Sequence, residues 1–209
     1  MSLTALELLR LKEQCEKLGD GKDYRCNNYI SNLMQTVLDF RMRTKYAQTY
    51  WQYFFRNHKN ITVVSDLQTI LDKYPNDKDG NLALAEDLWN TKHGARAKFL
   101  RKLIECFEER GITDQESLEK WVKTANFETH VKGQFKTKEF SIGYVLFEWL
   151  QIRCGVDTVK PDVHVLNFIR DAIGRSVEPE EAVKGLKKIA KILNRKAYLL
   201  DAAIWEARP

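Results

Sequence analysis

Residues that interrupt helices are scarce in this chain of 209 amino acids, which has only 10 glycines and 4 prolines. Charged residues make up 30% of it, and most of them are good helix formers. We find no convincing strand pattern, internal repeat or low-complexity segment, and apolar residues recur at helical spacing. The sequence therefore predicts an all-α protein, a bundle of about ten helices with short connections.

Clustered cysteines are also missing. The four cysteines are scattered at Cys15, Cys26, Cys106 and Cys154. None forms a CxxC pair, and no histidine lies at zinc-finger spacing from them. We therefore expect reduced thiols, no structural metal or other cofactor, and no iron–sulfur cluster.

Long apolar runs are absent as well. No stretch of about 18 apolar residues occurs, so we expect no membrane span. The first residues lack a basic start followed by an apolar core, so we expect no signal peptide. Together with the cysteine usage, these features favour a cytoplasmic protein without a membrane partner.

Positive charge is modest in total but uneven along the chain. The net charge is +5 at neutral pH, yet residues 131–138 hold three lysines and residues 182–196 hold six cations, and neither segment contains an acid. The ordinary interpretation of such a run is a solvated helix face. The functional interpretation is a surface that follows the phosphate backbone of a nucleic acid.

Several helix boundaries can be placed from local signals. Asn28 or Ser31 is expected to cap the helix that follows, and Thr113 with Glu116 matches a capping box. Apolar residues recur at helical spacing through residues 140–155, which predicts a buried central helix.

The segment GVDTVKPDVHVLNFIRDAIGR, residues 155–175, begins a helix in an unusual way. Pro161 forces Lys160 into an extended conformation, so the next helix starts sharply at Asp162. The backbone N–H groups and the dipole of a helix N-terminus favour the charged form of a carboxyl there. Asp162 is therefore a helix cap, a carboxylate that does chemistry, or both, because the two roles are compatible.

This segment resembles the helix-hairpin-helix (HhH-GPD) DNA glycosylase superfamily. In that family a glycine ends a buried helix seven residues before an aspartate, and Gly155 and Asp162 have that interval here, with His164 matching the histidine of its D-x-H. LMQTVLDFRMRTKYAQTY is similar to the family's early helix and following turn, which puts Met42 near the DNA-inserted side chain. SDLQTIL followed by ARAKFLRKLIECFEE resembles the small helices that precede a basic helix.

The resemblance covers roughly residues 28–207 and implies two helical lobes with a cleft between them. Residues 1–209 would form one glycosylase-like unit, in which residues 28–125 make a helical lobe. Residues 126–175 would supply a hairpin-like segment, the central helix and the Asp162 helix. The terminal parts, residues 1–27 and 176–209, would pack together.

The implied function is a monofunctional DNA glycosylase of base-excision repair. It would act as a monomer on double-stranded DNA, flip a damaged or mismatched base and hydrolyse its N-glycosidic bond. Asp162 would be the catalytic carboxylate, which stabilises the oxocarbenium-like sugar and activates a water, and His164 would order the site by hydrogen bonding. The alternatives are a non-catalytic helical DNA-binding protein that keeps the fold, and an interaction module unrelated to DNA.

The family's hairpin carries two glycines, and here the pattern differs. Counted back from Asp162 without a gap, KEFSIGY stands in that place and lacks the expected glycines, and Tyr144 then replaces the Schiff-base lysine of bifunctional members. A shifted register puts the hairpin at residues 131–138, retains Gly133 and leaves Lys136 or Lys138 at the lysine position. Tyr144 indicates an enzyme without lyase activity.

The remaining candidates follow from helical spacing and charge. Glu148 shares a helix face with Tyr144 and would line a base pocket, or pair with Arg153 or another cation. Four aromatic residues are candidates for stacking on a flipped base: Tyr144, Trp149, Trp51 and Phe135. The DNA-binding candidates are Met42, Lys132, Gly133, Lys136, Lys138, Lys187, Lys188 and Lys191.

Overall fold

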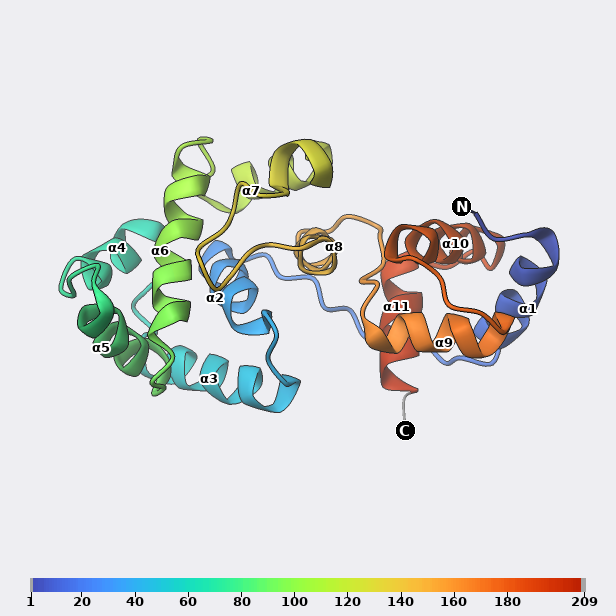
Figure 1. Cartoon of the computed structure of the whole chain (residues 1–209), viewed down its shortest axis with the longest axis horizontal. Coiled ribbons are helices and arrows are strands. Elements are labelled where there is room, and N and C mark those ends of the chain that lie inside the picture. Colours follow the sequence, from blue (N-terminus) through green and yellow to red (C-terminus); the bar gives the residue numbers. More distant parts are fainter. Residues whose placement is uncertain (1, 208–209) are drawn as a thin grey trace. The chain divides into compact units, whose positions relative to one another are not determined.

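The computed structural model of the chain describes residues 2–207, and over that range it contains eleven α-helices, one π-helical turn and no strand (Figure 1). The all-α fold predicted from the sequence is confirmed. Contacts divide the chain into two units. The terminal unit comprises the residues up to Arg25 together with those from Phe147 onward, and the middle unit is Cys26–Leu146.

The terminal unit is built on a group of helices from both ends of the chain. Helix α1 packs against α9 and α10, and α11 packs against both of the same helices. Its fully buried core includes Leu11, Ile169, Leu186 and Leu200. The helices are α1 (Ala5–Cys15), α9 (Val163–Ile173), α10 (Pro179–Ile192), α11 (Ala197–Glu206) and most of α8 (Tyr144–Arg153).

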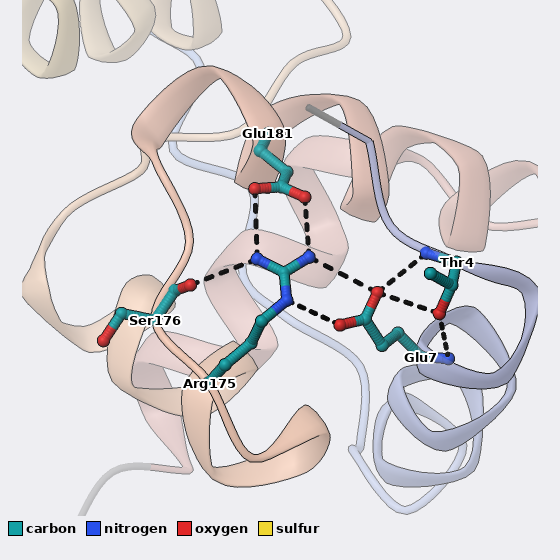
Figure 2. Close-up of polar contacts among 5 residues, drawn as sticks. All are labelled: Thr4, Glu7, Arg175, Ser176 and Glu181. Atoms are coloured by element: carbon teal, nitrogen blue, oxygen red, sulfur yellow. Dashed lines mark hydrogen bonds and ion pairs between the residues drawn. The ribbon is translucent and has the colours of Figure 1, made fainter.

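Arg175, in the connection between α9 and α10, fastens this unit together (Figure 2). Its guanidinium donates to Glu7 Oε1 at 2.6 Å on α1 and to Glu181 Oε1 at 2.8 Å on α10. Glu7 also receives the backbone N–H of Thr4 in a capping box at the start of α1. The Arg175 hydrogen bond is the main reason that the pKa of Glu7 falls to about 2.

The middle unit is organised around α6, which packs against α2 and α5. Phe99, Leu100 and Leu103 of α6 are fully buried. The helices of this unit are α2 (Tyr29–Asp39), α3 (Thr44–Asn57), α4 (Val64–Leu71), α5 (Lys78–Trp89), α6 (Gly94–Glu108), α7 (Gln115–Thr124) and the π-helical turn η1 (Phe127–Val131).

A buried arginine closes the C-terminal end of α2. Arg96 is 7% exposed, and its guanidinium donates to the carbonyls of Val37, Leu38 and Phe40 at 2.6, 3.4 and 2.9 Å. The last carbonyls of a helix have no partner within the helix, so a side-chain donor there removes a desolvation cost. The connection from α2 to α3 therefore begins from a fixed helix end.

Two of the expected helix caps can be compared directly with the structure. Asn28 caps α2 by accepting from Ser31 N at 2.8 Å, which decides between the two residues proposed from the sequence. The capping box expected at Thr113 and Glu116 is wrong by one residue, because Asp114 is the cap and Ser117 its partner. The Ser117 hydroxyl accepts from the N–H groups of Thr113 and Asp114, so Thr113 is outside the helix.

Between η1 and α8 the chain is irregular. An isolated antiparallel bridge joins Lys136 to Ser141. Gln134 N donates to Val131 O at 3.0 Å, and Gly133 between them has a φ of 75°, as the third residue of a type II turn requires. Within residues 2–207, no helix has the length and apolarity needed to cross a bilayer.

Candidate functional site

The chain approaches Asp162 through a short segment that leaves α8 at Gly155, whose φ is 86°. Asp162 N donates to Lys160 O at 2.8 Å, which makes a γ-turn around Pro161. Asp162 then caps α9, because its Oδ1 accepts from His164 N at 2.9 Å and from Val165 N at 3.3 Å. The cap predicted from the Pro-Asp sequence is confirmed.

The second oxygen of Asp162 has a different environment. Asp162 Oδ2 lies 3.8 Å from Lys160 Nζ, and the Asp162 side chain is 18% exposed. The same Lys160 ammonium lies 4.8 Å from the centre of the Trp149 ring, a cation–π distance. One carboxylate oxygen of this partly exposed side chain therefore faces a cation, while the other accepts from backbone N–H groups.

A second carboxyl near Asp162 is that of Asp201 on α11, which was not identified from the sequence. It is 6% exposed, and its Oδ1 accepts from Lys160 N at 2.9 Å. Burial first, and then the negative charge of Asp162, raise the pKa of Asp201 to about 7. The signal available in the sequence was a single aspartate in the otherwise apolar run AYLLDAAIW.

Helix α11 holds the segment before Asp162 at two points one turn apart. Asp157 Oδ1 accepts from Ala197 N at 2.7 Å and from Tyr198 N at 3.3 Å, which supplies the cap that Lys196 does not provide. Lys160 N donates to Asp201, which lies four residues after Ala197 on α11. These two anchors determine where the γ-turn and Asp162 lie.

Glu148 serves the same segment from α8. It is 6% exposed, and Thr158 Oγ1 donates to its Oε2 at 2.5 Å. Glu148 therefore fastens α8 to the chain that leads to Asp162, and its role in lining a base pocket stays a prediction.

The expected role of the His164 ring in ordering the site stays a prediction. His164 is exposed and contributes its backbone N–H to Asp162, and within residues 2–207 the structure gives its ring no hydrogen-bond partner. The position orders Asp162 through the backbone, which any residue other than proline can do.

The other candidates fall in two places. Lys187, Lys188 and Lys191 are exposed on α10 in the terminal unit. The remaining candidates belong to the middle unit, where Tyr144 lies against the ring of Phe127 at 5.4 Å. They are Met42, half-buried after α2, the exposed turn residue Gly133, and the exposed Lys132, Lys136 and Lys138.

Two of the middle-unit candidates have other partners. Lys132 Nζ lies 2.8 Å from Glu128 Oε2, so part of its charge is offset by an acid just outside the basic run. Phe135 is 1% exposed and packs against Phe107 and Trp121, so the expectation that it stacks on a base is wrong. The sequence around Phe135 is polar, and only the tertiary packing shows that it is a core residue.

Comparisons with known proteins show the family to which the chain belongs. Within residues 2–207, no group of three or more His, Cys, Asp or Glu side chains is gathered as metal ligands would be. No curated protein and no solved structure matches the chain. A family model matches residues 11–208, and the chain therefore belongs to the family described as Domain of unknown function (DUF8548).

Proposed function

We propose that this protein is a monofunctional DNA glycosylase that flips a damaged or mismatched base and hydrolyses its N-glycosidic bond. The observation that carries the proposal is Asp162. One of its oxygens is fixed by two backbone N–H groups, and the other lies 3.8 Å from Lys160 Nζ on a side chain that is 18% exposed. This carboxylate stands in the stretch that resembles the HhH-GPD superfamily, whose two-lobed fold is part of the proposal.

Asp162 would act through its charge. Base departure leaves a cationic, oxocarbenium-like sugar, and a carboxylate about 4 Å away at an effective dielectric near 20 stabilises it by roughly 4 kcal/mol. That corresponds to about three decades of rate. The same oxygen would orient the attacking water. Lys160 would move away from Oδ2 as the sugar enters, because both cations cannot occupy one side of the carboxylate.

Base release is the measurement that tests this proposal. The full chain is incubated with duplexes that carry alkylated, deaminated or oxidised bases, and the substrate found is then used in single turnovers. Asp162→Asn keeps an oxygen for the helix cap but removes the charge, so excision should slow by roughly three decades while stability changes little. Asp162→Ala should slow excision equally and also cost about 1 kcal/mol of stability.

The matched control is Asp171→Asn. Asp171 is an exposed acid on the same helix whose partner is the neighbouring Arg170. Its removal changes the net charge as Asp162→Asn does, and excision should continue at the wild-type rate. An Asp162→Asn protein that excises at the wild-type rate would make Asp162 a cap only.

Lyase activity should be absent. Tyr144 occupies the lysine position in the gapless register, and a tyrosine cannot form a Schiff base. Borohydride treatment in the presence of abasic DNA should therefore trap no covalent adduct. A trapped adduct that disappears in Lys136→Gln or Lys138→Gln would instead establish the shifted register and a bifunctional enzyme.

One observation favours a second candidate, a DNA-binding protein without catalysis. Lys160 Nζ already lies 3.8 Å from the oxygen that would face the sugar. A protein that binds duplex DNA but releases no base from any duplex of the panel would belong to this second class.

A further inference from the structure

A pocket of about 400 Å³ lies where α10 ends and α11 begins, within the terminal unit. Two buried alanines, Ala190 and Ala197, form part of its lining. Its volume is in the range of small-molecule sites. Four cations and one carboxylate also line it: Lys187, Lys191, Arg195, Lys196 and Asp157.

The pocket exists because the chain reverses within a few residues. Arg195 N donates to Ala190 O at 2.9 Å and Asn194 N to Lys191 O at 3.3 Å, the two bonds of a Schellman motif. Asn194 adopts the left-handed conformation this needs, with a φ of 51°. The reversal brings the lysines at the end of α10 beside the first turn of α11, and Asn194 also lines the pocket.

Two of the charged groups at the pocket already have partners. The Asp157 carboxylate accepts the first N–H groups of α11. The Arg195 guanidinium donates to the carbonyls of Leu18 and Gly19 at 3.3 and 2.6 Å. These contacts hold the pocket lining in place, so the pocket is supported by the segment that follows α1 and by the segment that leads to Asp162.

The three lysines at the pocket are different. Within residues 2–207, no acidic side chain forms an ion pair with Lys187, Lys191 or Lys196, whereas Lys12 of α1 has Glu16 at 2.5 Å. Lys187 and Lys191 are four residues apart on one helix, where like charges repel each other. The pocket therefore concentrates positive charge that this part of the chain does not neutralise.

We propose that this pocket binds a phosphate group. A phosphate placed between the lysines relieves their repulsion and accepts hydrogen bonds from ammonium groups and from the Asn194 amide. The group is either a backbone phosphate of DNA or a free phosphomonoester. The proposal does not require Asp162 to be catalytic, so it stands or falls separately from base excision.

Two double variants in the terminal unit test the pocket. Lys187→Gln with Lys191→Gln removes two cations that line it. Lys184→Gln with Lys22→Gln removes two exposed cations of the same unit that do not line it. Both have the same net charge, and all four side chains are exposed, so both should fold, which their amide spectra verify.

The measurement is a titration of the ¹⁵N-labelled full chain with inorganic phosphate at constant ionic strength. Phosphate should shift the amides of Asn194, Arg195, Lys196 and Ala197 saturably in the wild type and in the Lys22/Lys184 variant. Affinity should be weaker by at least about tenfold in the Lys187/Lys191 variant. Equal responses of the two variants, or shifts that do not saturate, would overturn the pocket.

A second titration distinguishes the sources of the phosphate. An undamaged duplex that shifts the same amides and is displaced by inorganic phosphate identifies a backbone phosphate as the ligand. Phosphate binding without any response to the duplex identifies a free phosphomonoester. The second result would leave a phosphate pocket in a protein that does not bind DNA there.

Discussion

Asp201 is the residue whose charge depends most directly on the fold. Burial and the neighbouring Asp162 raise its pKa from 3.8 to about 7, so the folded protein holds this proton more tightly than the unfolded chain does. Folding stability should therefore fall as the pH rises from 3.8 to about 7 and should not change further above that range on this account. The carboxyl stabilises the fold only while it is protonated.

Asp201→Asn should remove this dependence. The asparagine keeps an oxygen to accept from Lys160 N but carries no charge at any pH. At about pH 8 the variant should be more stable than the wild type, and at about pH 4 the two should be similar. Urea denaturation across this range measures the difference, and parallel curves for the two proteins would contradict the assignment.

Asp162→Asn should also lower the pKa of Asp201, because the charge of Asp162 is the second cause of its rise. The Asp201 carboxyl carbon can be followed by NMR through a pH titration. An unchanged Asp201 midpoint would mean that burial alone sets the pKa and that the two carboxyls do not interact.

At the scale of helices, the sequence predicted what local spacing and capping chemistry determine. The apolar period identified α8, and the Pro-Asp pair located the start of α9. The Thr113 box failed because two adjacent residues, Thr113 and Asp114, both have capping side chains, and only the geometry decides between them.

The contacts that join helices could not be predicted in this way. Asp201 meets Lys160 across 41 positions in the chain, Arg96 meets Leu38 across 58, and Arg175 meets Glu7 across 168. Arg96 and Arg175 look like ordinary surface charges in the sequence, and Asp201 differs from them only in its apolar neighbours. The partner of each residue is determined by tertiary packing, which the period of a single helix does not contain.

Arg96→Met should destabilise the middle unit through the end of α2. The methionine fills a similar volume but leaves the carbonyls of Val37, Leu38 and Phe40 without their buried donor. Loss of these charge-assisted bonds should cost about 2–4 kcal/mol in chemical denaturation. Arg56→Met, an exposed site on α3, is the control and should change stability little. An Arg96 variant as stable as that control would show that the cap contributes nothing.

The Arg175 clamp, formed by Arg175 with Glu7 and Glu181, should make folding stability depend on pH in the acid range. The pKa of Glu7 is about 2 in the fold and 4.5 ordinarily, so its stabilising effect is complete above 4.5 and is lost as the pH falls toward 2. Glu7→Gln should be less stable than the wild type at neutral pH and should lose less stability between those values. Glu13→Gln, an exposed site on the same helix, should behave like the wild type in acid denaturation. Identical acid profiles for the Glu7 variant and the wild type would contradict the clamp.

At the scale of the whole chain, the net charge of +5 is a small difference between 34 cations and 29 acids. Some surface cations have acids nearby, as Lys12 and Lys132 do. Such pairs contribute little to stability, and a lysine paired with an acid attracts DNA phosphates only weakly. The distribution of unpaired lysines, more than the total, determines how the protein would bind DNA.

The affinity for duplex DNA should fall steeply as the salt concentration rises, and Lys187 and Lys191 of α10 should account for part of that dependence. The slope of log affinity against log salt concentration is negative. Each phosphate that a lysine neutralises releases counterions and makes this slope steeper by about 0.9. Lys187→Gln with Lys191→Gln should make the slope shallower by about 2, because neither lysine forms an ion pair with an acidic side chain in residues 2–207 and both would contact phosphates. Lys12→Gln should leave the slope unchanged, since Glu16 already offsets that cation.

The measurement is duplex affinity by fluorescence anisotropy at several salt concentrations. A wild-type slope near zero would remove the DNA proposal entirely. An unchanged slope in the double variant would place the phosphate contacts on other lysines, such as Lys136 and Lys138 in the connection before α8.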